Sequence, residues 1–203
     1  MNKGITTEEY QSRNMMGFEG DGILKKSIKG LIEKHDIKTV IETGTYHGGT
    51  TKVFSDMVYH VITVESNPEY YEISKTNLAG LGNITQVLGQ SQYVLPHILV
   101  EEILDSKILF FLDAHWQDYC PLKDELRIIA EAGIQPVIAI HDFYNPHSPK
   151  MGYDTYNGKR LDIEYIKHEL VAIYGDNLAY HYNKFAEGAM RGCVFIYPVN
   201  KLN

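Results

Sequence analysis

Hydrophobic residues occur in two spacing patterns along the chain. Residues 22–35 carry apolar side chains at the three- and four-residue spacing of a helix buried on one face. Residues 107–112 form a nearly continuous apolar run, as expected of a central parallel strand covered on both faces. Runs of the second kind alternate with helical segments up to residue 174. This alternation predicts an α/β fold.

Turn and cap residues set the predicted element ends. Asn67 and Pro68 open a helix that Gly80 stops, and Gly133 and Gly175 end two later helices. The last two strands are joined by a polar loop and close like a hairpin. The predicted fold is a Rossmann-like, doubly wound, mostly parallel seven-stranded sheet with an antiparallel last strand and helices on both faces. Strands are predicted at 38–42, 61–65, 84–88, 107–112, 137–140, 178–182 and 193–197, and helices at 22–35, 49–57, 68–79, 91–104, 121–132 and 161–174.

Composition narrows the class of protein. The 203 residues are enough for one domain with a large core, and we divide them into a polar N-terminal segment, 1–21, and a single domain, 22–203. A net charge of -7 without a basic run disfavours a nucleic-acid partner. We expect no membrane span and no signal peptide, and the two cysteines form no metal or disulfide pattern. A cytoplasmic protein is expected, and a homodimer is left open.

The segment Val40–Thr51 carries the first functional signal. An apolar strand ends at Glu42, turns through Gly44 and Gly48, and opens a helix, while Glu65 ends the next strand. Such a βαβ unit holds an adenosine-bearing ligand, with the second acid accepting hydrogen bonds from ribose hydroxyls. Tyr46 stands where the dinucleotide fingerprint needs glycine, and Glu42 would repel a pyrophosphate but suits an ammonium and a sulfonium. These details favour S-adenosylmethionine over NAD.

The predicted cofactor site extends over four strand ends. Gln90 follows the third predicted strand and could read the edge of adenine, although Ser91 beside it serves equally well as a helix cap. Asp113 follows the fourth predicted strand and could instead cap the following turn. The predicted cofactor-binding residues are Glu42, Gly44, Tyr46, Gly48, Glu65, Ser66, Gln90, Ser91 and Asp113.

The order of these motifs resembles the class I S-adenosylmethionine-dependent methyltransferases over residues 22–198. The segments Phe111–Tyr119 and Ile140–Phe143 are similar to the metal-dependent O-methyltransferases of the catechol type and of the macrolide-sugar type. The resemblance implies that Asp113 and Asp142 bind a divalent metal, magnesium or manganese. Gln117 stands where the catechol-type enzymes have a lysine base, and Phe143 stands where the third metal ligand usually lies.

Two histidines are candidates for the proton-transfer step. A hydroxyl nucleophile needs a base, a metal, or both near neutral pH. His115 lies two residues after Asp113 and could act as base, while His141 is a second base or a nitrogen ligand. If the fifth strand stays extended, His141 and Asp142 point to opposite faces. Both histidines also suit ordinary structural hydrogen bonds.

The predicted function is O-methylation of a small molecule such as a sugar or a secondary metabolite. An NAD-dependent oxidoreductase and a non-catalytic ligand-binding protein that kept the fold are the alternatives. Residues 143–160 lack a helical or strand pattern and are rich in tyrosine, lysine, proline and glycine. We expect this segment to be a mobile loop over the acceptor, with a variable surface insertion as the other interpretation.

Overall fold

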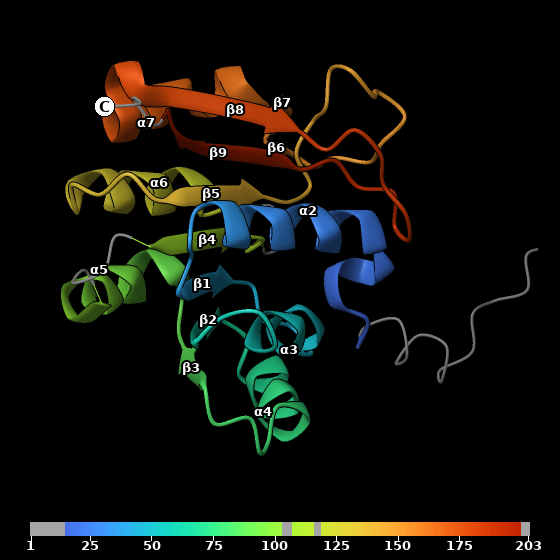
Figure 1. The fold of residues 1–203 in the computed structure, drawn as a ribbon, viewed down its shortest axis with the longest axis vertical. Helices are drawn as coiled ribbons and strands as arrows, with labels where there is room; N and C mark the ends of the chain where they lie inside the picture. The colour runs from blue at the N-terminus through green and yellow to red at the C-terminus, as the bar shows by residue number, and fades with distance from the viewer. Residues whose placement is uncertain (1–14, 103–106, 116–118, 200–203) are drawn as a thin grey trace, which may run out of the picture.

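The protein is a three-layer α/β domain in the computed structural model, which describes residues 15–102, 107–115 and 119–199. Seven strands form one sheet in the order β3-β2-β1-β4-β5-β9-β8, and β9 is antiparallel to both its neighbours (Figure 1). The predicted fold class is confirmed. The strands are β1 (Thr39–Thr43), β2 (His60–Glu65), β3 (Ile84–Leu88), β4 (Ile108–Leu112), β5 (Val137–Ile140), β8 (Leu178–Tyr182) and β9 (Val194–Pro198).

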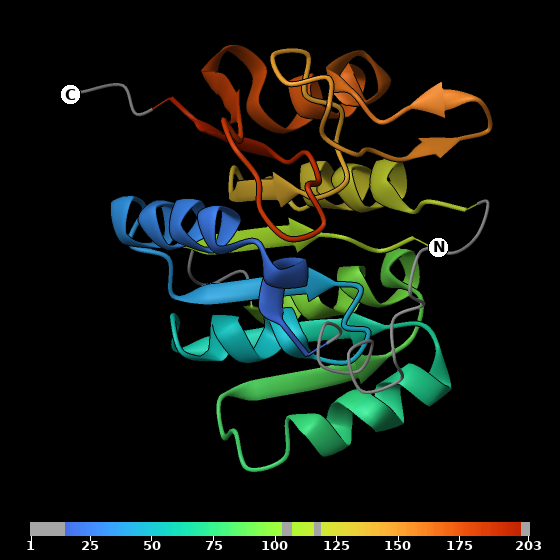
Figure 2. The ribbon, with the colours of Figure 1, turned by 90° about the vertical axis from the view of Figure 1, so that its right-hand side faces the viewer.

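Helices cover both faces of the sheet and bury two separate apolar clusters (Figures 1 and 2). Helices α5, α6 and α7 pack on the face of β1 that carries Ile41, and α2 and α3 pack on the face that carries Val40. No described helix combines the length and the apolar character needed to cross a bilayer. The helices are α2 (Gly22–Lys34), α3 (Gly49–Ser55), α4 (Pro68–Asn77), α5 (Ser91–Glu102), α6 (Leu122–Glu131) and α7 (Ile163–Tyr174), with short 3-10 turns η1 (Gly17–Gly20) and η2 (Gly175–Asn177).

The predicted structureless loop is largely ordered. It contains a small hairpin, β6 (Thr155–Tyr156) and β7 (Lys159–Arg160), and it buries Phe143, Met151 and Tyr156. The sequence interpretation missed this because these apolar side chains lie too far apart to form a periodic pattern. The prediction that this segment lacks regular structure is therefore wrong for residues 155–160, whereas its mobility over an acceptor stays a prediction.

The described part of the N-terminal segment, residues 15–21, packs against the domain. Phe18 is 2% exposed and makes edge-to-face contacts with Phe54 and Phe111, at ring-centroid distances of 5.3 and 5.6 Å. Its N–H donates to Thr50 Oγ1 at 2.9 Å. Phe18 and the following Glu19 both have left-handed backbone angles, which reverse the chain before α2. The boundary at residue 22 stays a prediction.

Phe18→Ala is expected to lower the unfolding free energy by about 3–5 kcal/mol, because it leaves a cavity among the aromatic rings on the α2 and α3 face of the sheet. Urea unfolding followed by circular dichroism measures the change. Met16→Ala, two residues earlier and 51% exposed, is the matched control and should cost far less. Equal losses for the two variants would contradict the packing role of Phe18.

Candidate active site

A large cavity opens where the carboxyl ends of β1, β2 and β4 meet. Its volume is about 1150 Å³, and its lining comes from five strand ends, from η1 and from the loop before β9. Parallel strands place their carboxyl ends at one edge of the sheet, so residues distant in sequence converge there. Nine of the predicted site residues line it: Gly44, Tyr46, Glu65, Ser66, Gln90, Ser91, Asp113, His115 and Asp142.

The glycine-rich turn after β1 is tied to the end of β2. Glu65 accepts hydrogen bonds from the backbone N–H of Tyr46 at 2.7 Å and of Asn67 at 2.8 Å, one on each carboxylate oxygen. Gly44 has φ +90°, and a Cβ there would lie 2.6 Å from the Asp113 carbonyl oxygen. The β1 turn therefore needs glycine because it passes directly against the backbone that follows β4.

His47 and Tyr70, which the sequence interpretation did not select, form part of the cavity wall beside the predicted Tyr46. The Tyr46 ring stacks on His47 at 4.1 Å and meets Tyr70 edge-on at 4.6 Å. Tyr70 comes from α4, whose cap Asn67 fixes the start of that helix. Gly48 does not line the cavity; its backbone is left-handed, and its Cβ position lies 3.0 Å from Leu78. Its role in this structure is helix entry and packing.

Glu42 lies beneath the site, outside the cavity lining. The side chain is 1% exposed, and its Oε2 accepts from Thr51 at 2.5 Å and from Thr63 at 2.7 Å. Strand alternation turns Glu42 toward the α3 face of the sheet, where these hydroxyls satisfy it. Burial raises the pKa of Glu42 to about 8. The expected contact with a ligand ammonium or sulfonium therefore does not fit its position.

Glu42→Gln should flatten the pH dependence of stability. Between about 4.5, the ordinary pKa, and about 8, the native state keeps a proton that the unfolded state has lost. The unfolding free energy of the parent therefore falls as pH rises through this window, and the variant should remove up to about 1.4 kcal/mol per pH unit of that slope. Urea unfolding at about pH 5.5 and about pH 7.5 measures it. Exposed Glu72→Gln is the control, and an unchanged slope in Glu42→Gln would contradict the buried-acid assignment.

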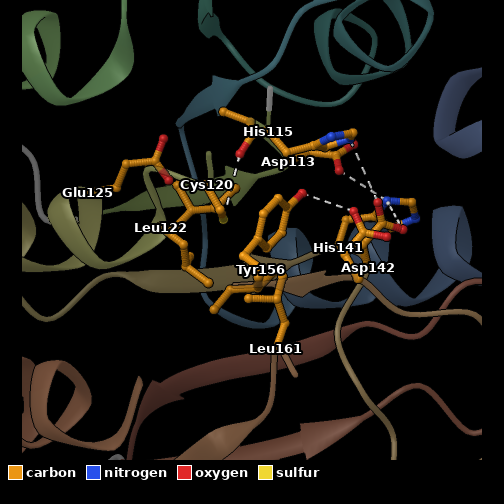
Figure 3. Close-up of a pocket in the computed structure, with 13 residues that line it drawn as sticks. Asp113, His115, Cys120, Leu122, Glu125, His141, Asp142, Tyr156 and Leu161 are labelled. Atoms are coloured by element: carbon orange, nitrogen blue, oxygen red, sulfur yellow. Dashed lines mark hydrogen bonds and ion pairs between the residues drawn. The ribbon is translucent and has the colours of Figure 1, made fainter. Parts of the chain in front are cut away.

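Asp113, His141 and Asp142 form a compact cluster at the ends of β4 and β5 (Figure 3). His141 Nδ1 lies 3.1 Å from Asp113 Oδ1 and 3.3 Å from Asp142 Oδ1. Strand β5 ends at Ile140, and Asp142 has φ +57°, so the chain is not extended here. The condition under which His141 and Asp142 would point to opposite faces, an extended chain beyond Ile140, is therefore not met, and both side chains belong to the cluster.

Opposite charges dominate the electrostatics of this cluster. Burial of His141, which is 4% exposed, disfavours its cation, but Asp113 and Asp142 outweigh burial and raise its pKa to about 10. Burial also opposes ionisation of Asp142, yet His141 and Arg191 hold its pKa below the usual value. Charge pairing with the two neighbouring aspartates thus favours the cationic form of His141.

Arg191 and Asp154 belong to the site and were missed by the sequence interpretation. Arg191 lies in the loop before β9 and donates from Nε to Asp142 and from Nη2 to Asp154. His115 lies on the cavity side, with its Nε2 3.9 Å from Asp142 Oδ2 and its side chain 48% exposed. The only signal in the sequence was the pair of glycines, Gly188 and Gly192, that flank Arg191.

Phe143 and Gln117 mark the two positions where the sequence departs from the catechol-type pattern. Phe143 is fully buried in the apolar core, so it neither lines the cavity nor points at the acid cluster. Trp116 and Gln117 lie outside the described residues.

Behind the cavity, Glu125 is 1% exposed, and the hydroxyls of Ser91 and Thr43 lie beside its carboxylate. Burial raises the pKa of Glu125 to about 7.

Part of the chain is similar in sequence to a known enzyme. No protein-family model matches the chain. Catechol O-methyltransferase of Bos taurus is 28% identical over 111 residues, which are 51% of this chain and 39% of that protein. The chain therefore spans about two fifths of the length of this curated relative.

Solved structures with this sheet include two O-methyltransferases. The TomG enzyme of Streptomyces achromogenes, involved in tomaymycin synthesis and solved with S-adenosylmethionine, has a TM-score of 0.64 at 14% identity and covers 87% of this chain and 80% of its own. An O-methyltransferase of Bacillus cereus, solved with S-adenosylhomocysteine, has a TM-score of 0.60 at 15% identity, with 87% and 81% covered. The predicted resemblance to the methyltransferase fold is confirmed.

Proposed function

We propose that this chain is an S-adenosylmethionine-dependent O-methyltransferase that acts on a small molecule such as a sugar or a secondary metabolite. The observation that carries the proposal is the meeting of two features in one cavity. Glu65, clamped by the N–H groups of Tyr46 and Asn67, lies at one end of the cavity. The acids Asp113 and Asp142 lie at the other.

The cavity fits the cofactor in size and in polar groups. Its volume, about 1150 Å³, leaves room for an adenosine-bearing ligand and an acceptor together. Glu65 keeps lone pairs free to accept from ribose hydroxyls, and Ser66 and Gln90 line the neighbouring wall. Ser91 is buried and lines the same wall. When bound, the cofactor would supply the electrophilic methyl group.

The acid cluster also fits a divalent metal. Asp113, His141 and Asp142 each offer one ligand atom, and these atoms lie within 4.8 Å of one another. His141 thus offers the third donor that the sequence lacks at Phe143. Two carboxylates and one imidazole suit manganese, and the carboxylates suit magnesium. Such an ion would lower the pKa of an acceptor hydroxyl.

The two histidines differ in their access to an acceptor. His115 lines the large cavity and is half-exposed, whereas His141 is buried between carboxylates and does not line it. We therefore assign proton removal to His115 and a ligating or orienting role to His141. The remaining catalytic contribution is positioning, because methyl transfer is an in-line displacement that depends on near-attack geometry.

A ligand panel tests the proposal directly. S-adenosylmethionine and S-adenosylhomocysteine should raise the melting temperature of the purified chain, and NADH should not. Transfer of a radiolabelled methyl group to a set of sugars, catechols and polyols, with and without Mn²⁺, then tests catalysis. Stabilisation by NADH alone would refute the assignment. Cofactor binding without transfer to any acceptor would favour a non-catalytic binding protein.

A further inference from the structure

Arg191 holds the cluster of Asp113, His141 and Asp142 from one side through a charged hydrogen bond to Asp142, and it pairs with Asp154 as well. It bridges two carboxylates, Asp142 at the end of β5 and Asp154 in the segment before β6. Its side chain is 25% exposed, so the bridge is largely sheltered from water. Charge-assisted hydrogen bonds of this kind are short and strong.

The surrounding backbone is built to hold this guanidinium. A Cβ at Gly152 would lie 2.8 Å from Arg191 Nη1 and 3.1 Å from its Cδ, so a larger residue there would have to displace the guanidinium. Gly152 N–H donates to the Met190 carbonyl at 2.8 Å, and Gly192 N–H donates to the Gly152 carbonyl at 2.9 Å. These bonds tie the loop that carries Arg191 to the segment that carries Asp154.

The bridge competes with a metal ion for the same oxygen atoms. Two groups of side chains could ligate a cation, Asp113–His141–Asp142 and His115–Asp142–Asp154, and they share Asp142. Arg191 already donates to the shared acid and to Asp154. A fixed positive charge in a sheltered site also repels a divalent cation more strongly than it would in water.

From this arrangement we infer that Arg191 is the built-in counter-ion of the acid cluster and sets its metal affinity. With the guanidinium in place, a divalent ion binds weakly, because it must share or displace the partner of Asp142. This inference concerns the metal site of the proposed function. Arg191 is a positioning residue here, and its contribution is measured by metal binding rather than by turnover.

The test is a titration of the full chain with Mn²⁺ alone. Calorimetry measures the heat of binding, and electron paramagnetic resonance measures the Mn²⁺ that stays free. Arg191→Gln removes the charge and keeps one amide donor, so it should bind Mn²⁺ at least tenfold more tightly than the parent. Arg191→Lys keeps the positive charge, so its Mn²⁺ affinity should stay within about threefold of the parent, because the charge still repels the divalent ion. Arg160→Gln is the matched control, because Arg160 pairs with Asp162 away from the cluster.

A second variant keeps the inference testable if Arg191→Gln does not fold. Arg191→Met removes the charge and keeps an unbranched side chain, and it should also tighten Mn²⁺ binding at the cluster of Asp113, His141 and Asp142 by at least threefold. Unchanged or weaker binding in the folded Arg191→Gln variant, or no binding to any variant, would overturn the inference. S-adenosylmethionine titration of the same samples separates this from failure of the proposed function, which predicts cofactor binding in all of them.

Discussion

Glu65→Ala is expected to weaken S-adenosylmethionine binding by at least tenfold. The carboxylate is held in place by the N–H groups of Tyr46 and Asn67, so it is preorganised to accept from both ribose hydroxyls. Each lost charge-assisted hydrogen bond costs about 1.5–3 kcal/mol before compensation, and about 1.4 kcal/mol corresponds to a factor of ten. Calorimetry on the folded variant measures the loss.

The controls separate ribose recognition from a structural effect. Glu69→Ala changes a carboxylate in the first turn of α4 and should leave the affinity within twofold of the parent. Glu65→Gln keeps an acceptor for one of the two N–H groups and should fold, yet it should still bind the cofactor more weakly. Parent-like affinity in Glu65→Ala would remove this residue from the site.

The second large effect concerns the metal. Asp142→Asn removes a ligand atom common to both possible cation clusters, so it should abolish Mn²⁺ binding and slow methyl transfer by about 10²-fold or more. Cofactor affinity should stay within about threefold, because the ribose end of the cavity is untouched. Excess chelator should have the same effect on the parent enzyme.

Asp124→Asn is the matched control for this experiment, since Asp124 is an exposed acid paired with Arg127. It should leave both metal binding and turnover unchanged. Full activity of the parent in excess chelator would refute the role of the metal. If Asp142→Asn were also fully active, the reaction would be a metal-independent transfer with His115 as the base.

The parts of the site that were predictable follow from local sequence. The glycine turn of β1 and the acid that ends β2 are read from consecutive residues, and parallel pairing brings such strand ends to one edge without further information. Asp113, His115 and Asp142 were selected for the same reason. Their convergence at one cavity follows from the strand order alone.

The parts that were missed depend on contacts distant in sequence or on one backbone angle. Arg191 reaches Asp142 from a polar loop 49 residues away, and no spacing rule predicts that pairing. The positive φ of Asp142 breaks the extended chain just after β5, whose end at Ile140 was predicted, and it brings His141 and Asp142 into one cluster. Glu42 was assigned to the ligand because its strand-end position was known, whereas its partners Thr51 and Thr63 decide which way it points.

The close backbone contacts of the loops around the cavity determine which of its lining positions tolerate substitution. At Gly44 and Gly188 a Cβ would collide with a neighbouring main chain, so a library that randomises them should return mostly glycine. Met16, Tyr119 and Ala189 line the same cavity with side chains instead. Met16 and Tyr119 are also well exposed, so a change of acceptor preference should be sought at such positions.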